Sequence, residues 1–134
     1  MEDRDPLTER VMTSCYRVYN VSGPGFNKKI YHNALTLDFD QEGLKYETEK
    51  RFEVYYQNNK VGKLIIDLVV ENKVIVEVKA ITGNIPDIFK YQVISYLRVS
   101  SLMHRFRYFL IFCAEGASAK VRENCHGRRF WEFW

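Results

Sequence analysis

The chain has 134 residues, 46% of them hydrophobic, and its 20 basic and 17 acidic residues give a formal charge of +3. This length predicts one domain, residues 1–134, built around a single hydrophobic core. The small positive charge is compatible with nucleic acid as a partner, but it does not by itself select one.

The composition argues against several classes of protein. No segment approaches the ~20 apolar residues that span a bilayer, and the charged N-terminus does not resemble a signal peptide. The three cysteines, Cys15, Cys113 and Cys125, have no paired spacing, which argues against a disulfide framework or a zinc site. We therefore expect an intracellular protein, cytoplasmic or nuclear, that makes no contact with a membrane.

Two helices are predicted first along the chain. Asp5 and Pro6 favour a helix start, and apolar residues at helical spacing continue this helix to about Asn20. A second helix is expected from Asn27 to Gln41, ended by Gly43. The apolar residues of the second helix that are expected to face inward are Ile30, Ala34, Leu35 and Leu37.

Three antiparallel strands are expected next. The predicted strands cover residues 45–56, 61–70 and 73–80. Polar and apolar residues alternate in the first, while the runs LIIDLVV and VIVEVKA in the other two are rich in β-branched residues, as in buried strands. A helix near 87–99 and a strand near 105–112 complete the order. This order predicts an α+β fold, with a central and mostly antiparallel sheet flanked by helices.

Charged residues interrupt both buried runs: Asp67 lies in the first, and Glu77 and Lys79 lie in the second. If the three-residue connection centres on Asn72, Asp67 lies across from Glu77 with Cβ atoms roughly 5 Å apart, and Lys79 shares their face. A two-residue turn would put Asp67 on the other face. We prefer the three-residue connection because it brings the three charges together.

Two carboxylates at this distance repel each other unless a proton or a cation lies between them. The sequence therefore predicts a Mg²⁺ or Mn²⁺ site in which Asp67 and Glu77 bind the ion, with the carbonyl of Val78 as a further ligand. The ion would activate water for phosphodiester hydrolysis, and Lys79 would position that water or neutralise the phosphate. Spacing alone leaves open that these are ordinary surface charges.

Three segments of the chain resemble the GxxExxY proteins, a branch of the PD-(D/E)xK nuclease-like superfamily. They read GPGFNKKIYHNAL, VYYQNNKVGKLIIDLVVENKVIVEVKA and QVISYLRVS, in the order of the family, within about residues 9–112. The resemblance implies a restriction-endonuclease-like fold in which the three strand charges are the catalytic triplet. It also implies that Gln92 and Tyr96 face the site from one side of a helix, although packing on that side explains them equally well.

One position departs from the motif that names this family. Gly25 and Tyr31 match it, but Lys28 stands where the motif has glutamate. A lysine removes an oxygen ligand and can pair with Asp67 and Glu77 in place of the ion. Alternatively, Lys28 and Lys29 at a helix N-terminus would contact nucleic-acid phosphate; a solvated helix start is equally open.

These features favour a Mg²⁺-dependent nuclease that hydrolyses nucleic acid, with DNA preferred over RNA. The alternative is a catalytically weakened or inactive form of the fold that binds nucleic acid or serves in protein assembly, as a homo-oligomer or as a subunit of a larger complex. The intact triplet of Asp67, Glu77 and Lys79 favours the enzyme, whereas Lys28 favours the alternative.

Overall fold

The computed structural model describes residues 6–80, 88, 91, 92, 95, 108–113 and 120–123. The helices are α1 (Pro6–Ser22) and α2 (Lys28–Gln41), and residues 88, 91, 92 and 95 are also helical, as expected. The strands are β1 (Tyr46–Tyr56), β2 (Asn59–Val70), β3 (Val74–Lys79), β4 (Tyr108–Cys113) and β5 (Lys120–Glu123). No helix within these residues is long and apolar enough to cross a membrane.

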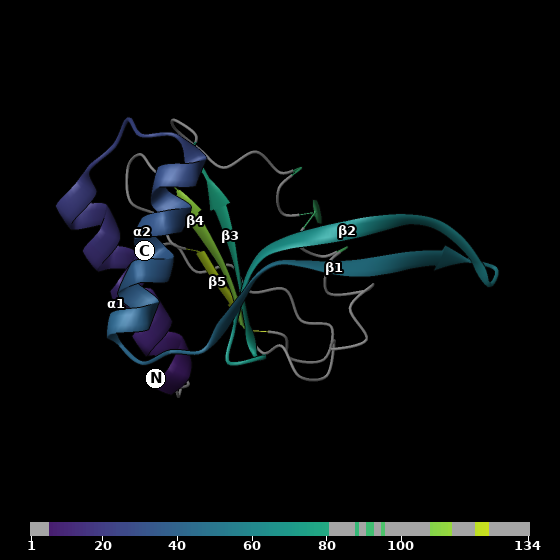
Figure 1. Ribbon diagram of the computed structural model, residues 1–134, viewed down its shortest axis with the longest axis horizontal. Helices are drawn as coiled ribbons and strands as arrows, with labels where there is room; N and C mark the ends of the chain where they lie inside the picture. The colour runs from purple at the N-terminus through teal and green to yellow at the C-terminus, as the bar shows by residue number, and fades with distance from the viewer. Residues whose placement is uncertain are drawn as a thin grey trace.

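The described strands form one sheet in the order β1-β2-β3-β4-β5 (Figure 1). Neighbouring strands are antiparallel except β3 and β4, which are parallel. A parallel neighbour requires a crossover, and the helical residues that lie between β3 and β4 in sequence belong to it. The predicted α+β fold with a mostly antiparallel sheet is confirmed, while β5 was not anticipated.

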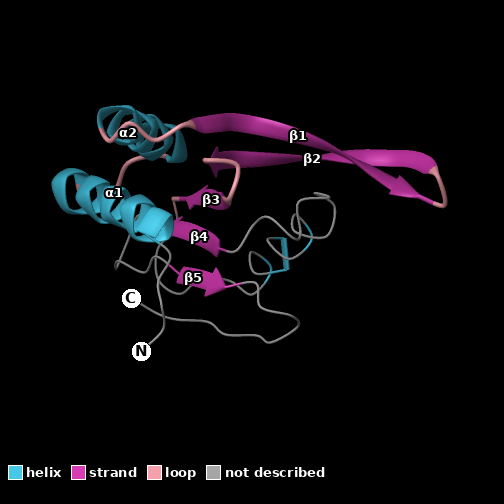
Figure 2. Ribbon diagram, turned by 90° about the horizontal axis from the view of Figure 1, so that it is seen from below, coloured by secondary structure: helices cyan, strands magenta, loops and turns pink. Residues whose placement is uncertain are grey.

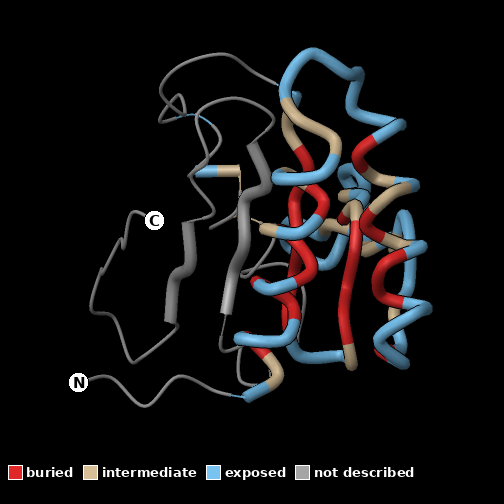
Figure 3. Tube along the Cα trace, turned by 90° about the vertical axis from the view of Figure 1, so that its left-hand side faces the viewer, coloured by how far each residue is buried: buried red, intermediate tan, exposed pale blue. Residues whose placement is uncertain are grey.

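The two helices pack together against one face of the sheet (Figure 2). Buried stretches of both helices face buried stretches of the strands (Figure 3). The strand residues in this core are Leu68, Val70, Val74, Val76 and Val78. Because side chains alternate along a strand, the residues next to them in sequence point to the opposite face. Asp67, Glu77 and Lys79 are among these residues.

The ends of α2 agree with the prediction, but its inward face agrees only in part. Asn27 caps the helix by accepting a hydrogen bond from the Ile30 amide at 3.1 Å, and Gly43 follows it with a φ of 70°. Ile30 is 43% exposed and Leu37 is 58% exposed, so placing both in the core was wrong. Leu35 is buried and Ala34 packs against the core, as expected, and the other buried residues of α2 are Tyr31, Asp38 and Phe39.

Tyr31 can be buried because its hydroxyl makes hydrogen bonds inside the protein. The side chain is 0% exposed, and its hydroxyl donates to the Gly23 carbonyl at 2.6 Å and accepts from the Phe26 amide at 3.1 Å. These bonds tie the turn before α2 to the helix itself. A phenol with both functions satisfied can lie in a core without the cost of a buried unpaired group.

Replacing Tyr31 with phenylalanine should lower the free energy of unfolding by about 1–3 kcal/mol, because two backbone groups lose their partner. Urea denaturation followed by circular dichroism measures this change. Tyr56→Phe, at a position 66% exposed, is the control and should change stability little. Equal midpoints for the Tyr31 variant and the natural protein would show that the hydroxyl contributes nothing.

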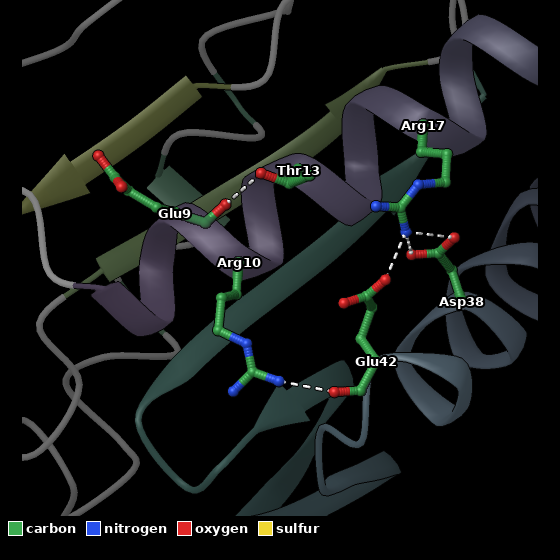
Figure 4. A network of polar contacts seen from close by, with 6 residues as sticks. All are labelled: Glu9, Arg10, Thr13, Arg17, Asp38 and Glu42. Carbon is green, nitrogen blue, oxygen red and sulfur yellow. Dashed lines mark hydrogen bonds and ion pairs between the residues drawn. The ribbon is translucent and has the colours of Figure 1, made fainter.

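An arginine cluster holds α1 to the C-terminal half of α2 (Figure 4). Arg17 lies 2.8 Å from a carboxylate oxygen of Asp38 and 2.9 Å from one of Glu42. Arg10 donates to the Glu42 carbonyl at 2.6 Å. The two carboxylates raise the pKa of Arg17, chiefly through its hydrogen bond to Asp38. These contacts and the shared core fix the position of α2, and hence of its first residue, Lys28.

Candidate functional site

The candidate site forms where β2 separates from β3. The two strands pair at Leu68–Val76, Val69–Ile75 and Val70–Val74, which is the register predicted for a connection centred on Asn72. Continued by one residue, this register brings Asp67 opposite Glu77. Beyond the last pair, β2 runs on with β1 and leaves β3 behind (Figure 1). The separation opens the sheet at the position of the predicted carboxylates.

Asp67 compensates for the lost strand pairing with its side chain. Its Oδ2 accepts a hydrogen bond from the Val78 amide at 3.0 Å, so the carboxylate takes the role of a strand carbonyl. The ladder between β1 and β2 also skips this position, where Glu49 would face Asp67. Glu49 has a φ of 49°, a left-handed conformation that is strained for a residue with a side chain. Asp67 therefore lies at an irregular point of both neighbouring strands.

Glu77 is a buried carboxylate with an unsatisfied oxygen. The residue is 2% exposed, and its Oε2 has no hydrogen-bond partner among the described residues. Its pKa rises from 4.5 to about 7, first because burial disfavours the charged form and then because Asp67 is negative; Lys79 and Lys28 oppose the rise. Such an oxygen suits a bound cation or a proton shared with Asp67.

The raised pKa of Glu77 predicts a pH-dependent stability in the metal-free protein. The folded state holds this proton more tightly than the unfolded state, so stability is greatest below about pH 4.5 and falls as the pH rises through about 7. The full loss of stability is about 3 kcal/mol, because a pKa difference of one corresponds to about 1.4 kcal/mol. Urea midpoints measured with a chelator from pH 5 to 8 test this, and Glu77→Gln should remove the decline. A decline that persists in the Gln variant would assign it to other groups.

Lys79 and Gln92 complete one side of the site. The Lys79 ammonium lies 3.3 Å from Glu77 Oε1 and donates to Gln92 Oε1 at 3.2 Å. Gln92 is one of the described helical residues that follow β3 in sequence, and the structure places its side chain within hydrogen-bond distance of Lys79. Tyr96, its predicted companion, lies outside the described residues.

Lys28, the first residue of α2, contacts the other carboxylate of the site, that of Asp67. Its ammonium lies 3.0 Å from both oxygens of Asp67, with the lysine side chain 47% exposed and the aspartate side chain 13% exposed. The ion pair considered for Lys28 from the sequence is thus present with Asp67. Lys29 is exposed and pairs with no described residue.

His32 is a neighbour of the site that the sequence did not single out. Its Nε2 lies 3.4 Å from the backbone carbonyl oxygen of Asp67. His32 follows Lys28 by four residues, and residues at this spacing lie on the same side of a helix. This spacing was the available signal, because any inward-pointing Lys28 brings His32 to the same strand.

The donor set fits a hard divalent cation that retains most of its waters. Two carboxylates and the nearby Val78 carbonyl offer oxygen ligands, as Mg²⁺ prefers. No group of three or more His, Cys, Asp or Glu side chains gathers in the part of the chain that the structure describes. Two lysines balance the two carboxylates, so a bound ion would have to displace the Lys28 ammonium from Asp67.

Comparison with protein-family models identifies the superfamily of the chain. The family model of the PD-(D/E)XK nuclease superfamily matches residues 5–120. The match includes both helices, the fork between β2 and β3, and each site residue above. Neither the curated proteins nor the solved structures gave a match. The family match spans most of the chain, and the chain belongs to the PD-(D/E)XK nuclease superfamily.

Proposed function

We propose that this protein is a Mg²⁺-dependent nuclease of the GxxExxY branch that hydrolyses phosphodiester bonds in nucleic acid, with DNA as the preferred substrate. The observation that carries this proposal is the gathering of Asp67, Glu77 and Lys79 where β2 leaves β3, with Oε2 of Glu77 buried and unpartnered. A charge cluster at a break in the sheet does not serve packing. It suits a reaction in which charge develops on a phosphate.

Each residue has a role in this proposal. Asp67, Glu77 and the Val78 carbonyl hold the ion, which when bound activates water and offsets charge on the phosphate. Lys79 orients the attacking water or neutralises the phosphate, and Gln92 keeps the lysine in place through their hydrogen bond. In the same proposal, Tyr96 supports the site from the following helix.

Lys29 is proposed to contact phosphate from the N-terminus of α2, where free backbone amides favour anions. Lys28 has the same proposed role only when it is released from Asp67. Its ion pair in the structure favours a second candidate function, in which the fold binds nucleic acid or other proteins without catalysis. The two candidates differ in whether the site takes up a divalent ion.

Metal-dependent melting and cleavage separate the two functions. The first predicts that the melting midpoint rises in millimolar Mg²⁺, since a ligand of the folded state at ten times its Kd adds about 1.4 kcal/mol of stability. It also predicts cleavage of plasmid DNA that a chelator stops, and weaker cleavage of RNA of matched length. A midpoint that ignores both Mg²⁺ and Mn²⁺, without cleavage, would favour the second function.

A further inference from the structure

The hairpin of β1 and β2 extends well beyond β3 as a two-stranded arm (Figures 1 and 2). We define the arm as residues 50–66, from the irregular position beside Asp67 to the turn at Gln57 and Asn58 and back. The turn residues have φ values of 46° and 62°, the conformation of tight hairpin turns. Near the tip, Tyr55 is 58% exposed and Val61 is 62% exposed. A long ribbon with this much exposed surface suits contact with a partner.

The arm is more basic than the rest of the chain. Its charged residues are Lys50, Arg51, Lys60 and Lys63 against the single acid Glu53, whereas the whole chain has 20 basic and 17 acidic residues. Lys60 lies 3.0 Å from Glu53, so these two charges balance. Arg51 and Lys63 make no ion pair with a described residue. Their charges are available to an anionic partner.

Arg51 and Lys63 share one face of the ribbon with the candidate site. The register pairs Arg51 with Ile65 and Glu53 with Lys63. Because side chains alternate, Lys63 and Ile65 of β2 point to the same face as Asp67. The basic face therefore runs outward from the carboxylates along the arm, and a polyanion at the site would continue along it.

We propose that the arm lies along a groove of double-stranded DNA, with Arg51 and Lys63 against backbone phosphates. The major groove of B-form DNA accepts a two-stranded ribbon. The eight residues from Asp67 to the tip at Asn59 would extend about 27 Å at the usual rise of a strand, which matches roughly eight base pairs of duplex. A-form RNA has a deep, narrow major groove that excludes such a ribbon. The contact of the arm with the groove does not depend on the proposed nuclease function. That function is needed only for the inference that the same DNA passes the site at Asp67.

Binding of a labelled 20-base-pair DNA duplex, measured by fluorescence anisotropy in a chelator at several salt concentrations, tests this proposal without cleavage. Arg51→Ala combined with Lys63→Ala should weaken binding at least about tenfold and reduce the slope of log K against log salt by roughly 1.8, for two lost phosphate contacts. Lys45→Ala combined with Lys73→Ala, two exposed lysines at the other end of β2, is the control of equal charge and should change both values little. Arg51→Lys combined with Lys63→Arg should restore binding.

Each other outcome overturns the proposal. An equal loss of affinity in the control variant would mean that binding depends on net charge. If affinity for duplex RNA depended equally on Arg51 and Lys63, contact with the major groove would be excluded. A natural protein that binds no duplex at low salt would exclude the contact altogether. Failure of the nuclease function is distinguishable, because the protein would then cleave nothing in Mg²⁺ while its binding still depended on the arm. If the double arm variant binds duplex DNA as tightly as the natural protein and the protein cleaves DNA, the arm contact is excluded while the nuclease function stands.

Discussion

Asp67→Asn and Glu77→Gln should each reduce Mg²⁺-dependent cleavage of DNA by roughly 100-fold or more. Substitution of residues that only support metal ligands already lowers metal affinity or activity by about 10–100-fold. Both substitutions keep the size of the side chain and remove one charged oxygen ligand. Both asparagine and glutamine can still accept a hydrogen bond, so the Val78 amide keeps a partner at position 67. Cleavage of plasmid DNA over time, with protein in excess, measures the loss.

Glu9→Gln is the control for these variants, because Glu9 is an exposed acid on α1 whose side chain makes no hydrogen bond or ion pair with a described site residue. Its cleavage rate should equal that of the natural protein. In a chelator, Glu77→Gln should melt no lower than the natural protein at pH 8, because the substitution removes a buried charge and its repulsion by Asp67. Full cleavage by either site variant would contradict the assignment of these carboxylates to the metal.

Much of the fold was predictable because local signals agree with the tertiary structure. The cap at Asn27 and the stop at Gly43 indicated α2, and the charged interruptions in two apolar runs indicated the candidate site. The register followed from a connection centred on Asn72, which we preferred because it alone brings the three charges together. In the structure, Glu71 and Asn72 have φ values of 50° and 55°, which closes this connection tightly.

The rest depended on contacts that no local pattern encodes. The inward face of α2 was misread in part because Tyr31 and Asp38 are buried, Tyr31 with a partner in the turn before the helix and Asp38 with Arg17 of α1. The fork at Asp67 is also invisible in the sequence, since β2 reads as one continuous strand. The parallel pairing of β3 with β4 depends on a crossover, which periodicity does not reveal.

Lys28→Glu should tighten the binding of Mn²⁺ by about tenfold or more. In the natural protein an ion must displace an ammonium that lies 3.0 Å from Asp67. A unit-charge pair at 4 Å is worth about 4 kcal/mol at an intermediate dielectric, but the lysine side chain is 47% exposed, so about 1–2 kcal/mol is a better value. Each 1.4 kcal/mol is tenfold in affinity. The substitution also adds a carboxylate beside the two already there.

Lys29→Glu provides a matched control, because it makes the same charge change one residue along α2 at a position that pairs with no described residue. Calorimetric titration of Mn²⁺ into the three proteins, without nucleic acid, compares their affinities directly. If Lys28 competes with the ion, only the Lys28 variant gains affinity, and its melting midpoint in Mn²⁺ rises accordingly. An equal gain in both variants would reflect general charge. Unchanged or weaker affinity in the Lys28 variant would mean that its ion pair with Asp67 does not control metal uptake.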